Sequence, residues 1–398
     1  MRPRLFAPGP VEVPAAVLAA LAGPVMHHRS PEFKELFMRV RAGLADVFCT
    51  PGDDVVVVTG SGSAAFEGVL LACVEPGGSV LSLHSGRFGV RWAELARRFG
   101  FAVSEVAAPA GSEYDLDALD RALLAVPDLA AVTVVHSETS TGTLHDVAAV
   151  AAAVRARHPA ALVLVDAVTS LAAAELLPHE WDLDAVVSGS QKGVMTPPGL
   201  SFAWLSNRAW HRGGDRLPAT YLDLRSEREK QRDGQTSFTP ATSLVVALDV
   251  ALGLIADAGL AARWRMKARL NDALLAGGAA MGLAGLARRP SPALAAMLVM
   301  DGVAAPDVVH AAKLRGVTIA GGEAELKGRL LRPSLLGWSD RYDLVVVTAA
   351  LEDALRAVGQ PVEHGSGVAA ALASLDAAEA RAGLSGRAAP LRRDAGTA

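Results

Sequence analysis

Several kinds of residue are scarce in this chain of 398 residues, and each scarcity excludes a class of protein. Cysteine occurs only as Cys49 and Cys73, without CxxC spacing, so neither a disulfide framework nor a cysteine-built metal site is expected. Charge of one sign is also lacking, because 38 Lys and Arg residues stand against 42 Asp and Glu residues. With a net charge of −4 and no long basic block, we expect no nucleic-acid partner.

Long hydrophobic runs are missing as well, although 51% of the residues are hydrophobic. The longest uncharged apolar stretch, residues 273–287, is shorter than the ~20 residues that cross a bilayer, and it contains several glycines. The N-terminal sequence MRPRLFAPGPVEV offers no uninterrupted apolar segment with a cleavage site. We therefore expect no membrane partner and a cytoplasmic location.

Between residues 55 and 205, short apolar runs alternate with alanine-rich helical patterns. The runs are VVVVTG, GSVLSLH, AAVTVVH, ALVLVDA, DAVVSGS and SFAWLS. They are apolar throughout rather than alternating with polar residues, which is typical of strands covered on both faces. The pattern predicts an α/β fold with a parallel or mixed sheet between two layers of helices.

The chain divides into four predicted segments. Residues 1–20 read as an extended arm, because Pro8, Gly9 and Pro10 disfavour a helix. Residues 21–255 form the large domain, and residues 256–376 a smaller α+β domain with helical patterns at 266–277 and 306–316 and strand-like runs at 293–300 and 342–349. Residues 377–398 lack a core pattern and are predicted to be a flexible tail.

A glycine- and serine-rich turn follows the first apolar run. Gly60, Ser61, Gly62 and Ser63 lie where this strand ends and a helix begins. Glycine lets a ligand approach the backbone, and the free N–H groups of a first helical turn attract an anion. The turn is therefore a candidate phosphate site, although an ordinary serine-capped turn explains it equally well.

Two ionisable residues follow later strands. Asp166 ends the run ALVLVDA, at the sheet edge where ligands bind in open α/β sheets, and it is either a ligand-binding carboxylate or a helix cap. Lys192 follows DAVVSGS among small residues, and it is either a surface lysine or an amine that binds an aldehyde. An acid facing a pyridine nitrogen and a lysine on an aldehyde are the two groups that pyridoxal 5′-phosphate (PLP) requires. A polar loop, SETSTG, follows the AAVTVVH run and is suited to contact ring substituents.

Together these segments closely resemble the class V family of fold-type-I PLP aminotransferases, in its alanine–glyoxylate/serine–glyoxylate (serine–pyruvate) branch. The resemblance runs through PGP, HHRS, GSGSAAFEG, SGRFGVRW, ETSTG, VDAVTS, SGSQKGVMTPPG and TPAT to an arginine near residue 332, and covers most of residues 5–350. It implies a large domain with a mostly parallel seven-stranded sheet between helices and a smaller α+β C-terminal domain. It also implies a homodimer with active sites at the subunit interface.

The resemblance assigns roles to particular residues. Lys192 would bond covalently to the PLP aldehyde and Asp166 would pair with the pyridine nitrogen, while Phe88 and Val168 would cover the two faces of the ring. The remaining cofactor contacts would come from Ser61, Gly62, Ser63 and Gln191 at the phosphate, Thr139 at the ring hydroxyl, and Thr239 from the neighbouring subunit.

The substrate would be held by Gly9 and Arg332. In the family an arginine grips the substrate α-carboxylate, and Arg332 in LLRPSLLGW occupies the corresponding place. Apart from Gly337 the surrounding pattern differs, so Arg329 and Arg341 remain alternatives. The histidines show no metal-ligand spacing, and no metal is expected.

The implied reaction is ping-pong transfer of an amino group from a small amino acid, alanine or serine, to a small keto acid, glyoxylate or pyruvate. Small substrates are favoured because no second basic cluster is evident for a distal carboxylate. The alternatives are a phosphoserine or aspartate aminotransferase, a lyase of the same class, or a non-catalytic subunit that retains the fold.

Overall fold

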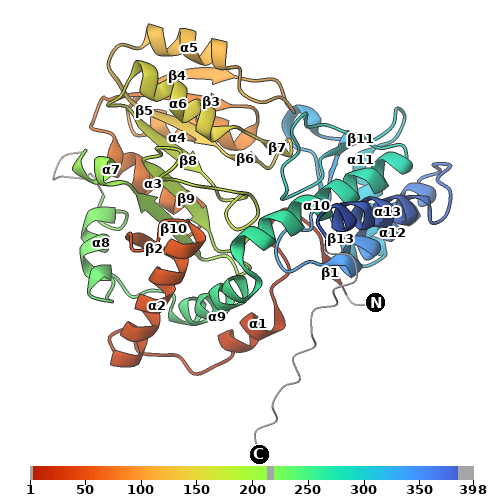
Figure 1. Ribbon diagram of the computed structural model, residues 1–398, viewed down its shortest axis with the longest axis horizontal. Coiled ribbons are helices and arrows are strands. Elements are labelled where there is room, and N and C mark those ends of the chain that lie inside the picture. The colour runs from red at the N-terminus through yellow and green to blue at the C-terminus, as the bar shows by residue number, and fades with distance from the viewer. Residues whose placement is uncertain (1–2, 213–218, 384–398) are drawn as a thin grey trace, which may run out of the picture.

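The computed structural model describes residues 3–212 and 219–383, and its central feature is a seven-stranded sheet (Figure 1). We call this the large sheet, and its strand order is β2-β10-β9-β8-β5-β3-β4. Its strands are β2 (Val55–Thr59), β3 (Ser79–His84), β4 (Ala102–Ala107), β5 (Leu129–Val135), β8 (Leu162–Asp166), β9 (Ala185–Gly189) and β10 (Leu200–Leu205).

All the pairings of the large sheet are parallel except those of β10, which runs antiparallel to β2 and β9. The carboxyl ends of β5, β8 and β9 therefore meet at one edge, so that Val135, Asp166 and Gly189 end neighbouring strands. The chain segments that follow these strands are brought together there, as expected for a ligand site in an open α/β sheet.

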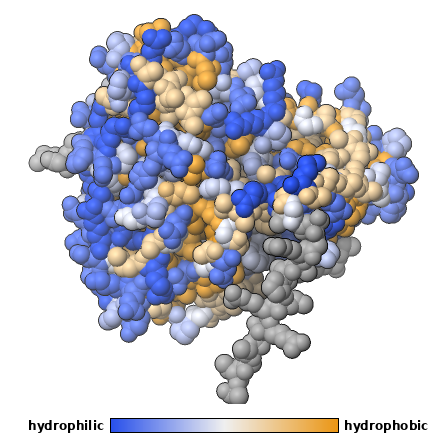
Figure 2. Space-filling view, viewed as in Figure 1, coloured by the Kyte–Doolittle hydropathy of each residue, from blue (hydrophilic) through white to orange (hydrophobic). Residues whose placement is uncertain are grey.

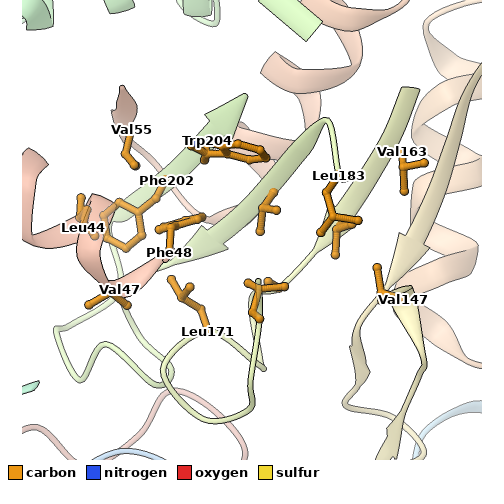
Figure 3. Close-up of a cluster of buried hydrophobic side chains, with 14 of the residues drawn as sticks. Leu44, Val47, Phe48, Val55, Val147, Val163, Leu171, Leu183, Phe202 and Trp204 are labelled. Carbon is orange, nitrogen blue, oxygen red and sulfur yellow. The ribbon is translucent and has the colours of Figure 1, made fainter. Parts of the chain in front are cut away.

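Helices cover both faces of the large sheet, as the apolar strands predict. Alternate residues of β8 belong to opposite cores, with Val163 and Val165 on one face and Leu162 and Leu164 on the other. The first core lies against α2 (Pro31–Val47), α5 (Leu116–Ala125), α6 (Val147–Arg157) and α9 (Thr242–Ala258), and Figure 3 shows part of it around Phe202 and Trp204. The second lies against α3 (Gly62–Cys73), α4 (Arg87–Arg98), α7 (Asn207–His211) and α8 (Leu224–Arg232).

A second unit follows α10 (Leu260–Ala280). It contains the small antiparallel sheet of order β11-β12-β15-β14, formed by β11 (Ala284–Gly285), β12 (Met297–Leu298), β14 (Ala320–Gly321) and β15 (Leu330–Arg332). The helices α11 (Ala305–Leu314), α12 (Arg341–Ala357) and α13 (Ser366–Arg381) pack with α10 in its core. We keep a domain boundary near residue 256 as a proposal, since α9 ends and α10 begins around Gly259.

The N-terminal arm contacts both units. Strand β1 (Arg4–Leu5) pairs with β13 (Val317–Thr318), and the chain then passes the edge of the large sheet where Val11 N donates to Gln191 O at 3.1 Å. The arm is not extended to residue 20 as predicted, because α1 (Ala15–Leu21) begins after Pro14 and packs on α9. The arm is therefore non-helical only up to Pro14, the segment in which the prolines disfavour a helix.

Two other local predictions are corrected. The run at 342–349 is not a strand but the start of α12, because Asp340 and Asp343 form a capping box and Leu344, Val347 and Leu351 share one buried helix face. The predicted tail begins too early, since α13 continues to Arg381 and buries Leu375. Residues 384–398 lie outside the described residues.

The surface in Figure 2 is hydrophilic over much of the part built on the large sheet, and hydrophobic residues gather more on the side of the small sheet. No single helix among the described residues has both the length and the apolar character to cross a membrane. Helices α9 and α10 meet these criteria only as a pair, and they are bent by 83° relative to each other.

Candidate active site

A cavity of about 340 Å³ lies at the edge where β5, β8 and β9 end. Ten of the twelve residues predicted for the site line it: Gly9, Ser61, Gly62, Ser63, Phe88, Thr139, Asp166, Val168, Gln191 and Lys192. They come from the N-terminal arm, the start of α3 and α4, and the loops after β5, β8 and β9. Segments distant in the sequence therefore converge on one small volume.

Asp166 is the last residue of β8, and its side chain is only 4% exposed. Its Oδ1 accepts a hydrogen bond from Val168 N at 2.8 Å, so the carboxylate also fixes the local turn. Burial raises the pKa of Asp166 to about 7. An acid so placed is stabilised in its charged form when a cation or a positively charged N–H enters the cavity.

Lys192 is not a surface lysine. Its Nζ donates to Pro8 O at 2.7 Å, and burial lowers its pKa to about 8, against which the charge of Asp166 acts. A large fraction of the amine is therefore neutral near pH 8, which is the form that attacks an aldehyde.

Gly9 fits tightly against this lysine. A Cβ atom at Gly9 would lie 2.5 Å from Cδ of Lys192 and closer still to Cε and Nζ. The backbone φ of Gly9, +149°, is one that residues other than glycine rarely adopt. The absence of a side chain at residue 9 is therefore a structural requirement of the lysine position.

The other end of the cavity is formed by the N-terminus of α3. Ser61 stands at the N-cap position, yet its side chain makes no capping hydrogen bond. A Cβ at Gly62 would lie 3.0 Å from Cγ2 of Val168, so the helix start and the Asp166 turn pack closely. Gln191 Oε1 is buried without a hydrogen-bond partner in the described part of the chain. These groups form a polar pocket at a positive helix end, as an anion requires.

Glu138 fixes the aromatic wall of the cavity, a role that the sequence pattern does not indicate. It is fully buried, and its Oε2 accepts from the backbone N–H groups of Phe88 at 3.0 Å and Gly89 at 3.2 Å. Its Oε1 accepts from Ser140 N at 2.9 Å. Burial raises the pKa of Glu138. The carboxylate anchors the start of α4 to the SETSTG loop, which had been interpreted only as a source of hydroxyl groups.

Thr139 and Arg332 join the two units beside the cavity. The Thr139 hydroxyl pairs with that of Thr169 at 2.5 Å, and Arg332 Nη1 donates to Thr139 O at 3.0 Å. Arg332 is 5% exposed and does not itself line the cavity. Arg329 is exposed, and Arg341 pairs with Asp376 on α13, so Arg332 is the best placed of the three arginines.

Thr239 does not line this cavity. It is exposed on the segment that follows α8, next to a small pocket of about 20 Å³ with Tyr221 and Phe238. Its predicted role in the site of a neighbouring subunit remains a prediction.

A buried cation supports the site from α10. Arg263 is 2% exposed and donates to the backbone oxygens of Ala172 at 3.1 Å, Gly193 at 3.0 Å and Gly337 at 3.0 Å. These carbonyls belong to the loops that follow Asp166, Lys192 and Arg332. One side chain thus fixes three loops relative to one another, a role that no local sequence pattern reveals. No group of three or more potential metal ligands is found among residues 3–212 and 219–383.

Comparison of this chain with known proteins shows which family it belongs to. The family model described as aminotransferase class-V matches residues 12–333. The small subunit of a soluble hydrogenase from Synechococcus is 37% identical over 92% of this chain and 97% of its own length. Serine–glyoxylate aminotransferase from Methylorubrum extorquens is 30% identical over 93% of this chain and 95% of its own length.

A solved structure agrees with both. Aspartate aminotransferase from Thermus thermophilus, of subgroup IV, superposes with a TM-score of 0.84 at 37% identity, covering 89% of this chain and 99% of that one. The matched family model, the full-length relatives and the fold-type-I architecture agree, and the chain belongs to the class V aminotransferases.

Proposed function

We propose that the protein is a PLP-dependent aminotransferase that moves an amino group from a small amino acid, alanine or serine, to a small keto acid, glyoxylate or pyruvate, in a ping-pong reaction. The observation that carries the proposal is the convergence of Asp166 and Lys192 on one cavity, beside a helix N-terminus. The family includes proteins named for these reactions, such as serine–glyoxylate aminotransferase from Methylorubrum extorquens.

The residues of the cavity fit this cofactor. The start of α3, with Ser61, Gly62 and Ser63, would hold the phosphate together with Gln191, whose buried Oε1 has no partner among the described residues. Phe88 and Val168 would cover the ring, and Thr139 would contact its hydroxyl group. When bound, PLP supplies an electron sink that stabilises negative charge at the substrate α-carbon.

The chain's own groups would handle the protons. Asp166, ionised against a ring N–H, would keep that nitrogen protonated. Lys192 Nζ, with its pKa lowered to about 8, would accept the substrate α-proton and return it on the product side. Arg332, whose Nη1 donates to the cavity residue Thr139, would bind the α-carboxylate with its guanidinium, and Gly9 would line the substrate space.

Transamination of aspartate is the second candidate. It is supported by the name of the Thermus thermophilus structure, which is as similar in sequence as any relative described above. A dicarboxylate needs a second cation, and Arg91 lines the cavity without an ion pair to a described residue that the structure records. Phosphoserine transamination and a class V lyase reaction are further alternatives for the same cavity.

A non-catalytic role is a proposal from another class of function, and it is suggested by the name of the Synechococcus hydrogenase subunit. The placement of Asp166 and Lys192 on one cavity opposes this role, because a protein without chemistry has no need to keep an acid and an amine there with pKa values shifted by burial. A dimer is proposed because Thr239 and the neighbouring Phe238 are exposed, as a contribution to a second subunit requires.

Steady-state rates with alanine, serine, phosphoserine and aspartate against glyoxylate, pyruvate and 2-oxoglutarate test the reaction. We expect turnover of the small pairs and its loss in Lys192→Ala, with the exposed Lys313→Ala variant as control. Turnover of aspartate alone would favour the second candidate. Release of product from cysteine or kynurenine, with no transamination of any pair, would refute the proposed aminotransferase activity. A protein that stays colourless with added PLP would support the non-catalytic role.

A further inference from the structure

The guanidinium of Arg332 is already occupied. Its Nε donates to Gly321 O at 2.7 Å, its Nη1 to Thr139 O at 3.0 Å and its Nη2 to Glu323 Oε1 at 2.6 Å. Two of these partners are backbone carbonyls, which leave the positive charge uncompensated. Glu323 therefore supplies the one carboxylate that the structure records on this arginine.

Glu323 is shared between two arginines. It lies between β14 and the short 3₁₀ helix η1 (Ala324–Leu326), and its second oxygen, Oε2, accepts from Arg87 Nη1. Arg87 opens α4, directly before Phe88 in the cavity wall, and its side chain is 63% exposed. Partial burial acts to raise the pKa of Glu323, but the hydrogen bonds and charges of Arg332 and Arg87 hold it below its ordinary value. Glu323 is thus an anion held between the small sheet and α4.

We propose that Glu323 occupies the place of the substrate carboxylate on Arg332, and that a monocarboxylate ligand displaces it onto Arg87. The inference rests on the proposed function, in which Arg332 receives the α-carboxylate. It adds that Glu323 controls how tightly a carboxylate binds.

Repulsion between two carboxylates on one guanidinium explains the displacement. A guanidinium has five N–H groups, and three of those on Arg332 have the partners named above. A carboxylate binds an arginine best through two parallel hydrogen bonds, and a second anion beside Glu323 would be repelled. When Glu323 leaves Nη2, that N–H group becomes available to the ligand and the repulsion between the two carboxylates is removed.

After the exchange each guanidinium has a carboxylate of its own, because Arg87 retains Glu323 while Arg332 takes the ligand. Arg87 is well suited to retain it, since its exposed side chain already holds Oε2 and can follow the carboxylate toward solvent. A ligand without a carboxylate offers Arg332 nothing in place of Glu323. The contact between Glu323 and Arg332 therefore favours ligands that carry a carboxylate, and it weakens their binding because Glu323 must first be displaced.

A double-mutant cycle with propionate tests this on the PLP-loaded protein, by isothermal titration calorimetry without turnover. We expect Glu323→Gln to lower the Kd for propionate roughly tenfold, the change that loss of one competing charge-assisted hydrogen bond produces. Arg87→Gln should raise the Kd, and the double variant should bind like Glu323→Gln, because Arg87 acts only through Glu323. Glu325→Gln removes the same charge from the same loop at an exposed residue and should leave the Kd unchanged.

The outcomes are distinct. An unchanged or higher Kd in Glu323→Gln overturns the inference, as does binding that survives in Arg332→Gln or that is absent from both the wild-type protein and Glu323→Gln. An additive effect of Arg87→Gln in the double variant would also refute it. Failure of the proposed function shows separately, as absence of transamination in a protein whose propionate cycle behaves as described.

Discussion

The contact between Gly9 and Lys192 makes Gly9→Ala a sharp test of the site. The substitution adds one methyl group, whose carbon would lie 2.5 Å from Cδ of Lys192 and closer to Cε and Nζ. Non-bonded carbon atoms approach to about 3.5–4.0 Å, so the lysine side chain or the arm must shift by roughly 1 Å. Misplacement of a reacting group by this distance reduces catalysis by about 10²-fold.

Backbone strain adds a second effect that must be separated from the first. The φ of +149° at Gly9 is unfavourable for alanine, which costs about 1–3 kcal/mol of stability. Gly52→Ala is a suitable control, because Gly52 also has a positive φ, +86°, but a Cβ there meets nothing within 4 Å. It should lose stability without losing activity.

The assay is kcat for the best substrate pair together with the midpoint of thermal unfolding for both variants. We expect Gly9→Ala to remain folded at the assay temperature with kcat lowered about 10²-fold. A Gly9→Ala variant with the kcat of the wild-type protein would refute the tight placement of Lys192. So would an equal loss of kcat in Gly52→Ala.

Three further predictions concern the groups around the cavity. Asp166→Asn should lower kcat by roughly 10²–10³-fold, the effect of losing one preorganised electrostatic partner, with little change in the binding of propionate. The rate at which apoprotein takes up PLP should rise with pH through about 8, because the neutral amine of Lys192 is the reactive form. The midpoint of this rise should move to lower pH in Asp166→Asn, since the charge of Asp166 raises the pKa of Lys192. A midpoint near 10.5, the ordinary pKa of a lysine amine, would contradict the burial of the amine. Arg263→Met should cost about 2–5 kcal/mol in urea unfolding, because three buried carbonyls lose their donor, whereas Arg265→Met on the exposed side of α10 should cost little.

The strands of the large sheet were predictable because burial on both faces leaves continuous apolar runs. The runs that became β2, β3, β5, β8, β9 and β10 were all recognised, whereas β4 was not, since its residues are mostly exposed at the sheet edge. The run at 342–349 misled because β-branched residues favour strands locally. Its capping box and the buried face of Leu344, Val347 and Leu351 decided for a helix, and that face matters only once α10 and α11 pack against it.

The candidate site was predictable to the extent that its residues follow strands or begin helices. Asp166 and Lys192 converge because β8 and β9 are parallel neighbours, so their carboxyl ends share an edge. Glu138, Arg263 and Glu323 act on partners that only folding brings near, such as the α4 backbone for Glu138 and three separate loops for Arg263. No spacing in the sequence signals such contacts, and these residues were missed.

The covalent site of the cofactor is the most direct test of the account. Protein loaded with PLP is reduced with borohydride, digested, and its peptides are analysed by mass spectrometry. We predict a pyridoxyl phosphate adduct on Lys192, whose amine lines the cavity and is kept partly neutral by burial, and none in the digest of Lys192→Ala. An adduct on another lysine, with Lys192 unmodified, would contradict the central claim.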